Sequence, residues 1–119
     1  MSVVLSFLLS VLTIFGPVLK VDGGRFVDIG NVKIGTVVSH EFVIKNEGNE
    51  PLIIEGLGKS CNCTEVSMES KIIKPGESSK LLIKVNTEGK FGRTSINVFI
   101  RDNSEDGENF VQLLMNCVE

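Results

Sequence analysis

The chain has 119 residues and a formal net charge of −3, so it is long enough for one domain and lacks the excess of basic residues that nucleic-acid binding requires. It has no tryptophan or tyrosine, and its phenylalanines lie mainly in segments expected to be strands, so we predict no aromatic platform for stacking bases or sugars. The only histidine is His40, whereas hydrolytic triads need a histidine beside the nucleophile. We therefore expect no enzyme, no catalytic residues and no cofactor.

An uncharged apolar run, Val3 to Leu19, opens the chain and is interrupted by Gly16-Pro17. The part before the break is about 13 residues, or roughly 20 Å of helix, against a membrane core of about 30 Å. This length is typical of the apolar region of a signal peptide. We expect residues 1–24 to be a signal peptide cleaved after Gly23 or an uncleaved membrane anchor; a strand packed on the domain is the third option.

The leader predicts that the protein is exported to the periplasm or cell envelope. Contact with the membrane would then occur only through residues 1–24, and only if the leader is not cleaved.

Residues 25–119 are expected to form one all-β domain, an immunoglobulin-like β-sandwich of about seven strands. Short β-type runs alternate there with turn signals, which is the pattern of a sandwich or barrel. The expected strands are 26–29, 37–45, 52–54, 63–68, 79–85, 94–101 and 110–118. The acidic segment 102–109 is expected to be an exposed loop.

Side chains of one parity in these strands should fill the core, because strand side chains alternate between the two faces. His40 shares the parity of Phe42, so we expect it to be a half-buried structural residue rather than a base. The predicted core consists of Phe42, Ile44, Ile54, Leu81, Ile83, Val85, Ile96 and Val98.

The three cysteines, Cys61, Cys63 and Cys117, are an odd number, so at least one is free, binds a metal or pairs with a partner. In an extended strand, Cα atoms two residues apart lie about 6.6 Å from each other, near the upper limit for a disulfide. A bend at Asn62 would relieve this distance, because asparagine tolerates left-handed backbone.

Cys61 and Cys63 are also weak candidates for a soft metal such as Cu(I), since two thiolates can chelate it. His40, Met68, Met115 or Cys117 would have to complete such a site, and a second ligand pair for zinc is missing. The third option is that one cysteine packs in the core while the other lies in the loop. Packing, a disulfide or redox role, and metal binding all stay open, and no metal site is favoured.

Five short motifs follow one another in a characteristic order between Phe26 and Gly92. They are Phe26-x-x-Ile29-Gly30, Ser39-His40-x-Phe42-x-Ile44-x-Asn46-x-Gly48, Pro51-Leu52-Ile53-Ile54, Ser60-Cys61-Asn62-Cys63-Thr64 and Ile73-Lys74-Pro75-Gly76-Glu77. This set resembles the bacterial domain of unknown function 1573 family, related to Hydin-type immunoglobulin-like domains. Asn62 stands where that family usually has glycine. The resemblance implies the fold, a secreted or envelope setting and a binding or scaffolding role, without an established reaction.

The sequence therefore favours a non-enzymatic, envelope-associated module that binds or scaffolds another protein, expected to be an envelope protein and not a nucleic acid. Open sheet edges in a sandwich can accept a partner strand. The alternative is a thiol-dependent carrier of Cu(I) or of redox equivalents that uses Cys61 and Cys63.

Overall fold

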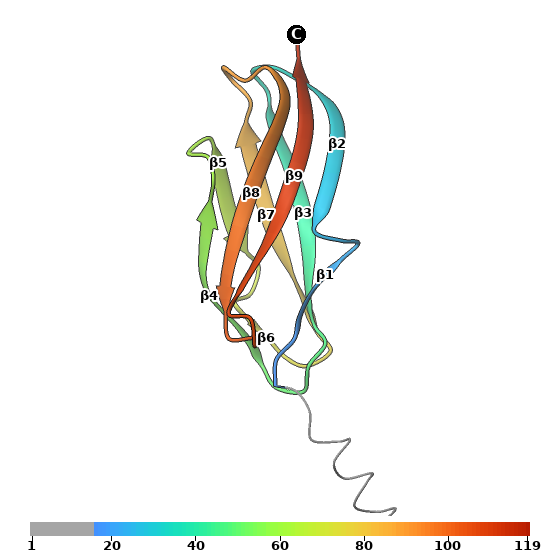
Figure 1. Cartoon of the computed structure of the whole chain (residues 1–119), viewed down its shortest axis with the longest axis vertical. Helices are drawn as coiled ribbons and strands as arrows, with labels where there is room; N and C mark the ends of the chain where they lie inside the picture. Colours follow the sequence, from blue (N-terminus) through green and yellow to red (C-terminus); the bar gives the residue numbers. More distant parts are fainter. Residues whose placement is uncertain (1–15) are drawn as a thin grey trace, which may run out of the picture.

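The computed structural model describes residues 16–119, which fold into two facing β-sheets, with the start of this segment and the C-terminus at opposite ends of the sandwich (Figure 1). The strands are β1 (Leu19–Asp22), β2 (Phe26–Lys33), β3 (Val37–Asn46), β4 (Leu52–Lys59), β5 (Thr64–Met68), β6 (Ile72–Ile73), β7 (Ser78–Asn86), β8 (Gly92–Asp102) and β9 (Glu108–Val118). The predicted all-β sandwich is confirmed. None of residues 16–119 lies in a helix long and apolar enough to cross a membrane.

The two sheets have the strand orders β1-β3-β7-β5 and β2-β9-β8-β4-β6. Neighbouring strands are antiparallel except β2, which runs parallel to β9. All seven expected strands are present, and the two additional ones are β1 and β6. The sequence gives no signal for β6, because a strand of two residues is too short to show alternation.

The core lies between the sheets and contains all eight side chains that we predicted for it, each at most 3% exposed. Strand β9 completes it with Val111, Leu113 and Met115, which follow the same period of two. The parity assignment of the predicted strands is therefore confirmed.

The sandwich begins earlier than the boundary at residue 25 that we predicted. Strand β1 pairs with β3, and its Leu19 and Val21 side chains are buried in the core. Gly23 and Gly24 have φ angles of +81° and +99°, a conformation that glycine adopts without strain, and they carry the chain from the four-stranded sheet into β2. The glycines that we interpreted as the flank of a cleavage site are thus the crossing between the sheets. The expected leader in residues 1–15 lies outside the described residues.

The expected exposed loop at 102–109 is correct only at its tip. Asp102 and Asn109, at its two ends, are buried, and the Asn109 Nδ2 donates to Asp102 Oδ2 at 2.8 Å. The backbone N–H of Ser104 donates to Asp102 Oδ1 at 2.8 Å. The buried Asp102 side chain therefore holds the β8–β9 turn together through these two hydrogen bonds. The acidic composition of segment 102–109 does not reveal this role.

Candidate functional site

The outer face of the five-stranded sheet carries three phenylalanines in adjacent strands. Because side chains alternate, Val98 and Ile100 point inward while Phe99 points outward from β8. The same alternation turns Phe110 outward on β9, and Phe26 begins β2. The exposed fractions of Phe26, Phe99 and Phe110 are 60%, 50% and 39%. We call these three residues the aromatic band.

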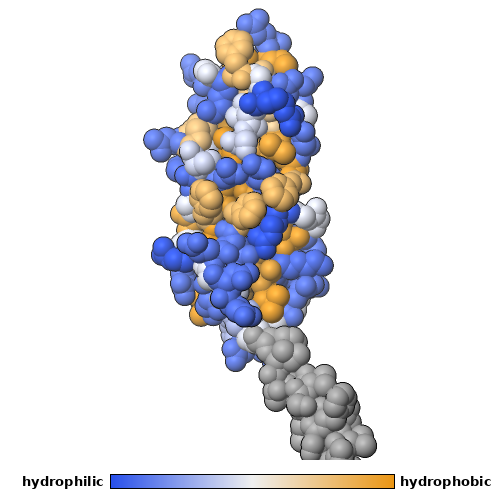
Figure 2. Space-filling model, viewed as in Figure 1, coloured by the Kyte–Doolittle hydropathy of each residue, from blue (hydrophilic) through white to orange (hydrophobic). Residues whose placement is uncertain are grey.

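The band is continuous across the sheet. Phe99 and Phe110 are direct partners in the antiparallel register of β8 and β9. The rings of Phe26 and Phe110 meet edge to face, with centroids 5.7 Å apart and planes at 72°, a favoured aromatic geometry. Figure 2 shows hydrophobic side chains gathered in a row across the middle of this face, with smaller hydrophobic patches among the hydrophilic surface above and below.

Glycines on β4 extend the band into a shallow depression. Gly58 pairs with Phe99 and Gly56 with Arg101, so β4 presents bare backbone beside these side chains. The Arg101 guanidinium lies over Gly56, where an added Cβ would come within 2.8 Å of Nη2. The depression has a volume of about 300 Å³ and is lined on one side by Phe99, Ile100 and Arg101 and on the other by Gly56, Leu57 and Gly58.

All three arginines of the chain lie at this face. Arg25 stacks over the Phe110 ring at 5.7 Å and donates to the Phe110 carbonyl at 3.0 Å and to Asn109 Oδ1 at 2.8 Å. Arg93 forms an ion pair with Asp28 at 3.2 Å. Arg25 is thus held in a fixed orientation against the aromatic band.

The opposite outer face, on the four-stranded sheet, has a different composition. Its outward positions include lysine, glutamate and serine, together with the exposed Val37, and ion pairs form between Lys80 and Glu41 at 3.9 Å and between Lys20 and Glu47 at 3.4 Å. Aromatic residues and arginine are enriched in the cores of protein interfaces, whereas lysine and glutamate are depleted there. In residue composition, the outer face of the five-stranded sheet therefore resembles an interaction surface, whereas the outer face of the four-stranded sheet resembles a solvated surface.

The aromatic band does not test our prediction that the chain has no aromatic platform for stacking bases or sugars, but it shows that most of the phenylalanines are exposed. Of the five phenylalanines in residues 16–119, only Phe42 is buried. Phe42 is also the one phenylalanine that we predicted for the core. Phe99 and Phe110 occupy the polar parity of their strands, and that is the signal by which the sequence could have revealed them.

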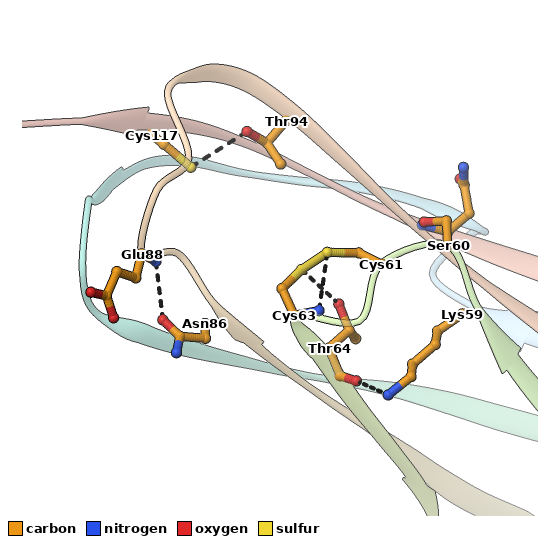
Figure 3. Close-up of a disulfide and its surroundings, with 10 residues drawn as sticks. Lys59, Ser60, Cys61, Cys63, Thr64, Asn86, Glu88, Thr94 and Cys117 are labelled. Carbon is orange, nitrogen blue, oxygen red and sulfur yellow. Dashed lines mark hydrogen bonds between the residues drawn. A yellow bond between two sulfur atoms is a disulfide. The ribbon is translucent and has the colours of Figure 1, made fainter.

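Cys61 and Cys63 are joined by a disulfide in the loop between β4 and β5 (Figure 3). Their Cα atoms are 5.1 Å apart, closer than in an extended strand, because the chain turns there and the backbone N–H of Thr64 donates to the Cys61 carbonyl at 3.2 Å. The bend at Asn62 thus removes the obstacle that an extended strand would present.

The other proposed ligands do not gather around this pair. Cys117 is a free, buried thiol beside the Thr94 hydroxyl at 3.5 Å, and Met115 is buried in the core. His40 is half-buried with its ring 4.8 Å from that of Phe42, as expected for a structural residue. Among residues 16–119, no three His, Cys, Asp or Glu side chains form a group that could hold a metal ion. In the disulfide, neither sulfur is the thiolate that Cu(I) requires.

The family described as protein of unknown function DUF1573 matches residues 20–116. This chain belongs to the DUF1573 family. The match begins within β1, in agreement with a domain that starts before residue 25. No curated protein matches the chain in sequence.

Several solved structures share the fold of this DUF1573 domain. A protein of unknown function from Porphyromonas gingivalis is 18% identical with a TM-score of 0.76; the match covers 85% of this chain and 47% of that one. The PapD-like domain 7 of human CEP192 is 10% identical with a TM-score of 0.67, and 85% of each chain is covered. The VesB protease of Vibrio cholerae is 17% identical with a TM-score of 0.65, covering 85% of this chain and 32% of that one. The chain thus spans about half and a third of the two bacterial proteins, and these likenesses concern the fold.

Proposed function

We propose that this domain is a non-enzymatic module of the periplasm or cell envelope that binds another protein through its aromatic band. The observation that carries the proposal is the exposure of Phe26, Phe99 and Phe110 in one row on the outer face of the five-stranded sheet, which also carries the exposed, paired Ile53 and Ile72. Exposing these rings to water is unfavourable, and a partner that covers them removes that cost.

Arg25 and Arg101 favour a protein as the partner. Aromatic and arginine side chains supply most interface hot spots, and within residues 16–119 neither arginine forms an ion pair within 4 Å, although Glu108 is the cross-strand partner of Arg101. The net charge of −3 speaks against nucleic acid.

The envelope setting rests on two independent features. The apolar run at the start of the chain is typical of an export signal, and disulfides such as Cys61–Cys63 persist in oxidising compartments. The proposal that the domain is not an enzyme is supported by His40, the only histidine, whose ring packs against Phe42 within β3.

Affinity capture from the native envelope tests the proposal. The full chain is compared with a variant carrying Phe26→Ser, Phe99→Ser and Phe110→Ser, and with Val37→Ser as control, because Val37 is a 63%-exposed apolar residue on β3. We expect the triple variant to retain less than about a tenth of the captured partner, as for loss of hot-spot residues, while the control retains it. Thermal unfolding of each variant verifies that the fold is intact.

Equal capture by the triple variant would reject the band as the binding surface. In particular, a partner that adds a strand to the open edge of β5 would bind the triple variant normally, since β5 belongs to the other sheet.

A further inference from the structure

The Cys61–Cys63 disulfide contributes little to holding its own loop together. The two cysteines are only two positions apart in the sequence. The stabilisation that a disulfide gives by restricting the unfolded chain grows with the length of the loop that it closes, so it is small here. Backbone bonds fix the same segment independently. The Ser60 N–H donates to the Asn97 carbonyl at 3.0 Å, and the Asn86 N–H donates to the Cys63 carbonyl at 2.9 Å. We expect the loop to keep its course when the sulfurs are reduced.

The two sulfurs differ in what surrounds them. Cys61 Sγ accepts the backbone N–H of Cys63 at 3.1 Å, a donor fixed by the turn (Figure 3). Cys63 Sγ has only the rotatable Thr64 hydroxyl, at 3.4 Å. A fixed N–H donor stabilises a thiolate, so Cys61 is the better leaving sulfur when the bond breaks.

Access favours attack on the other sulfur. Cys63 lines a surface depression of about 300 Å³, together with Val37, Asn62, Glu65, Lys84 and Asn86. The Lys84 ammonium attracts an incoming thiolate and the Glu65 carboxylate opposes it, while the Lys59 ammonium, bound to the Thr64 carbonyl, adds positive charge close to the loop. An incoming thiolate in this depression lies beside Cys63, whereas Cys61 does not line it.

We propose that Cys61–Cys63 is a reversible two-electron redox site that exchanges with a protein dithiol, with Cys63 as the attacked sulfur and Cys61 as the leaving sulfur. A thiolate of the dithiol forms a bond to Cys63 Sγ, the Cys61–Cys63 bond breaks, and the Cys61 thiolate takes a proton from water. The second thiolate of the dithiol then attacks its own neighbouring sulfur in the mixed disulfide and releases Cys63, which also becomes protonated. The dithiol loses two electrons and two protons and becomes a disulfide, and this chain gains both thiols.

Cys117 takes no part in this exchange. It is buried in β9 beside Thr94, so it provides an internal control for accessibility. The redox site is separate from the aromatic band, and its test does not depend on a partner bound there.

The test uses the full chain, purified without reductant and incubated with reduced glutathione as a monothiol probe. Alkylation after acid quenching, followed by fragment mass spectrometry, locates glutathione and the newly freed thiol. Two products are possible: one with glutathione on Cys63 and the alkyl group on Cys61, and one with these two groups exchanged. We expect the first product in at least a tenfold excess over the second. With dithiothreitol, two thiols should appear while the β-sheet circular dichroism spectrum is unchanged, and oxidised glutathione should restore the disulfide.

Glutathione found mainly on Cys61 would overturn the assignment of the two sulfurs. A disulfide that resists millimolar dithiothreitol until the protein is unfolded by denaturant would overturn the redox site itself. In a Cys117→Ala variant, dithiothreitol should release the same two thiols, and glutathione and the alkyl group should again be found on Cys63 and Cys61. If that variant does not fold, positional mapping in the wild-type chain still decides the proposal.

Discussion

The side-chain oxygen of Asn46, at the end of β3, accepts the backbone N–H of Val18 at 3.2 Å and that of Gly48 at 2.9 Å. Its Nδ2 donates to the carbonyls of Glu50 and Ile73, at 2.7 and 2.9 Å. One fully buried amide therefore joins the start of the domain, the β3–β4 turn and β6. All of its hydrogen-bonding groups are used, which is the condition under which a buried polar side chain stabilises a fold.

Asn46→Ala should destabilise the domain by about 2–4 kcal/mol, because four backbone groups lose their partner and one of them, the Ile73 carbonyl, is in a buried hydrogen bond. Denaturant unfolding measures this loss. The matched control is Asn49→Ala, whose exposed side chain accepts only the Gly16 N–H at 3.0 Å, and which should cost less than about 1 kcal/mol. Similar losses for both variants would contradict the role assigned to Asn46.

Strand β1 should be required for full stability. A chain that starts at Arg25 lacks Leu19 and Val21, whose burial is worth about 1.5–3 kcal/mol each, partly offset by the entropy of ordering the strand. We expect it to be roughly 2–4 kcal/mol less stable than a chain that starts at Gly16, as measured by urea unfolding. Cleavage after Gly23 would carry the same cost, so the N-terminus of the mature protein should lie at or before Gly16. Recovery of a stable mature form beginning at Gly24 would refute this.

Phe42 should be the most costly phenylalanine to truncate. It is 2% exposed, and Phe42→Ala should cost about 3–5 kcal/mol, as for other buried phenylalanines. Phe91→Ala is the control, because this ring is 72% exposed, and it should change the stability by no more than about 0.5 kcal/mol. A loss below about 1 kcal/mol for Phe42→Ala would mean that the core is packed differently.

Asp28 should titrate below the usual range of aspartate. The Gly30 N–H, donating to Asp28 Oδ1 at 2.9 Å, and then the Arg93 guanidinium hold the pKa of Asp28 below its ordinary value. Because the folded pKa is the lower one, the stabilisation is present above the unfolded pKa and is lost as pH falls through the folded pKa. In Arg93→Gln, the NMR-detected pKa of Asp28 should rise part of the way back, since the Gly30 bond remains. The control Lys80→Gln, on the other sheet, should leave the pKa of Asp28 unchanged. If Arg93→Gln does not change the pKa of Asp28, the ion pair makes no contribution to it.

Much of the fold follows from the sequence because alternation is a local property. In β7 and β8 every second residue is apolar, which fixes the inward set of Leu81, Ile83 and Val85 and of Ile96 and Val98 without knowledge of the partner strands. The turn at Lys74 to Glu77 is equally local, since proline and glycine restrict the backbone wherever they occur. These elements were predictable for that reason.

Strand β1 and the aromatic band could not be predicted in this way, because both depend on which distant segments of the chain lie side by side in the folded structure. The residues Leu19 to Asp22 become a strand only because β3 offers them an edge, and an apolar run in sequence does not reveal this. Phe26 and Phe110 are 84 positions apart, and only the parallel pairing of β2 with β9 brings their rings together. Local patterns in the sequence were sufficient to predict the strands other than β1 and β6, their inward faces and the possibility of a bend between Cys61 and Cys63. The tertiary structure decided where the domain begins, that the two cysteines meet, and that three phenylalanines form one surface, because pairing between distant strands depends on the packing of the whole chain rather than on any local pattern.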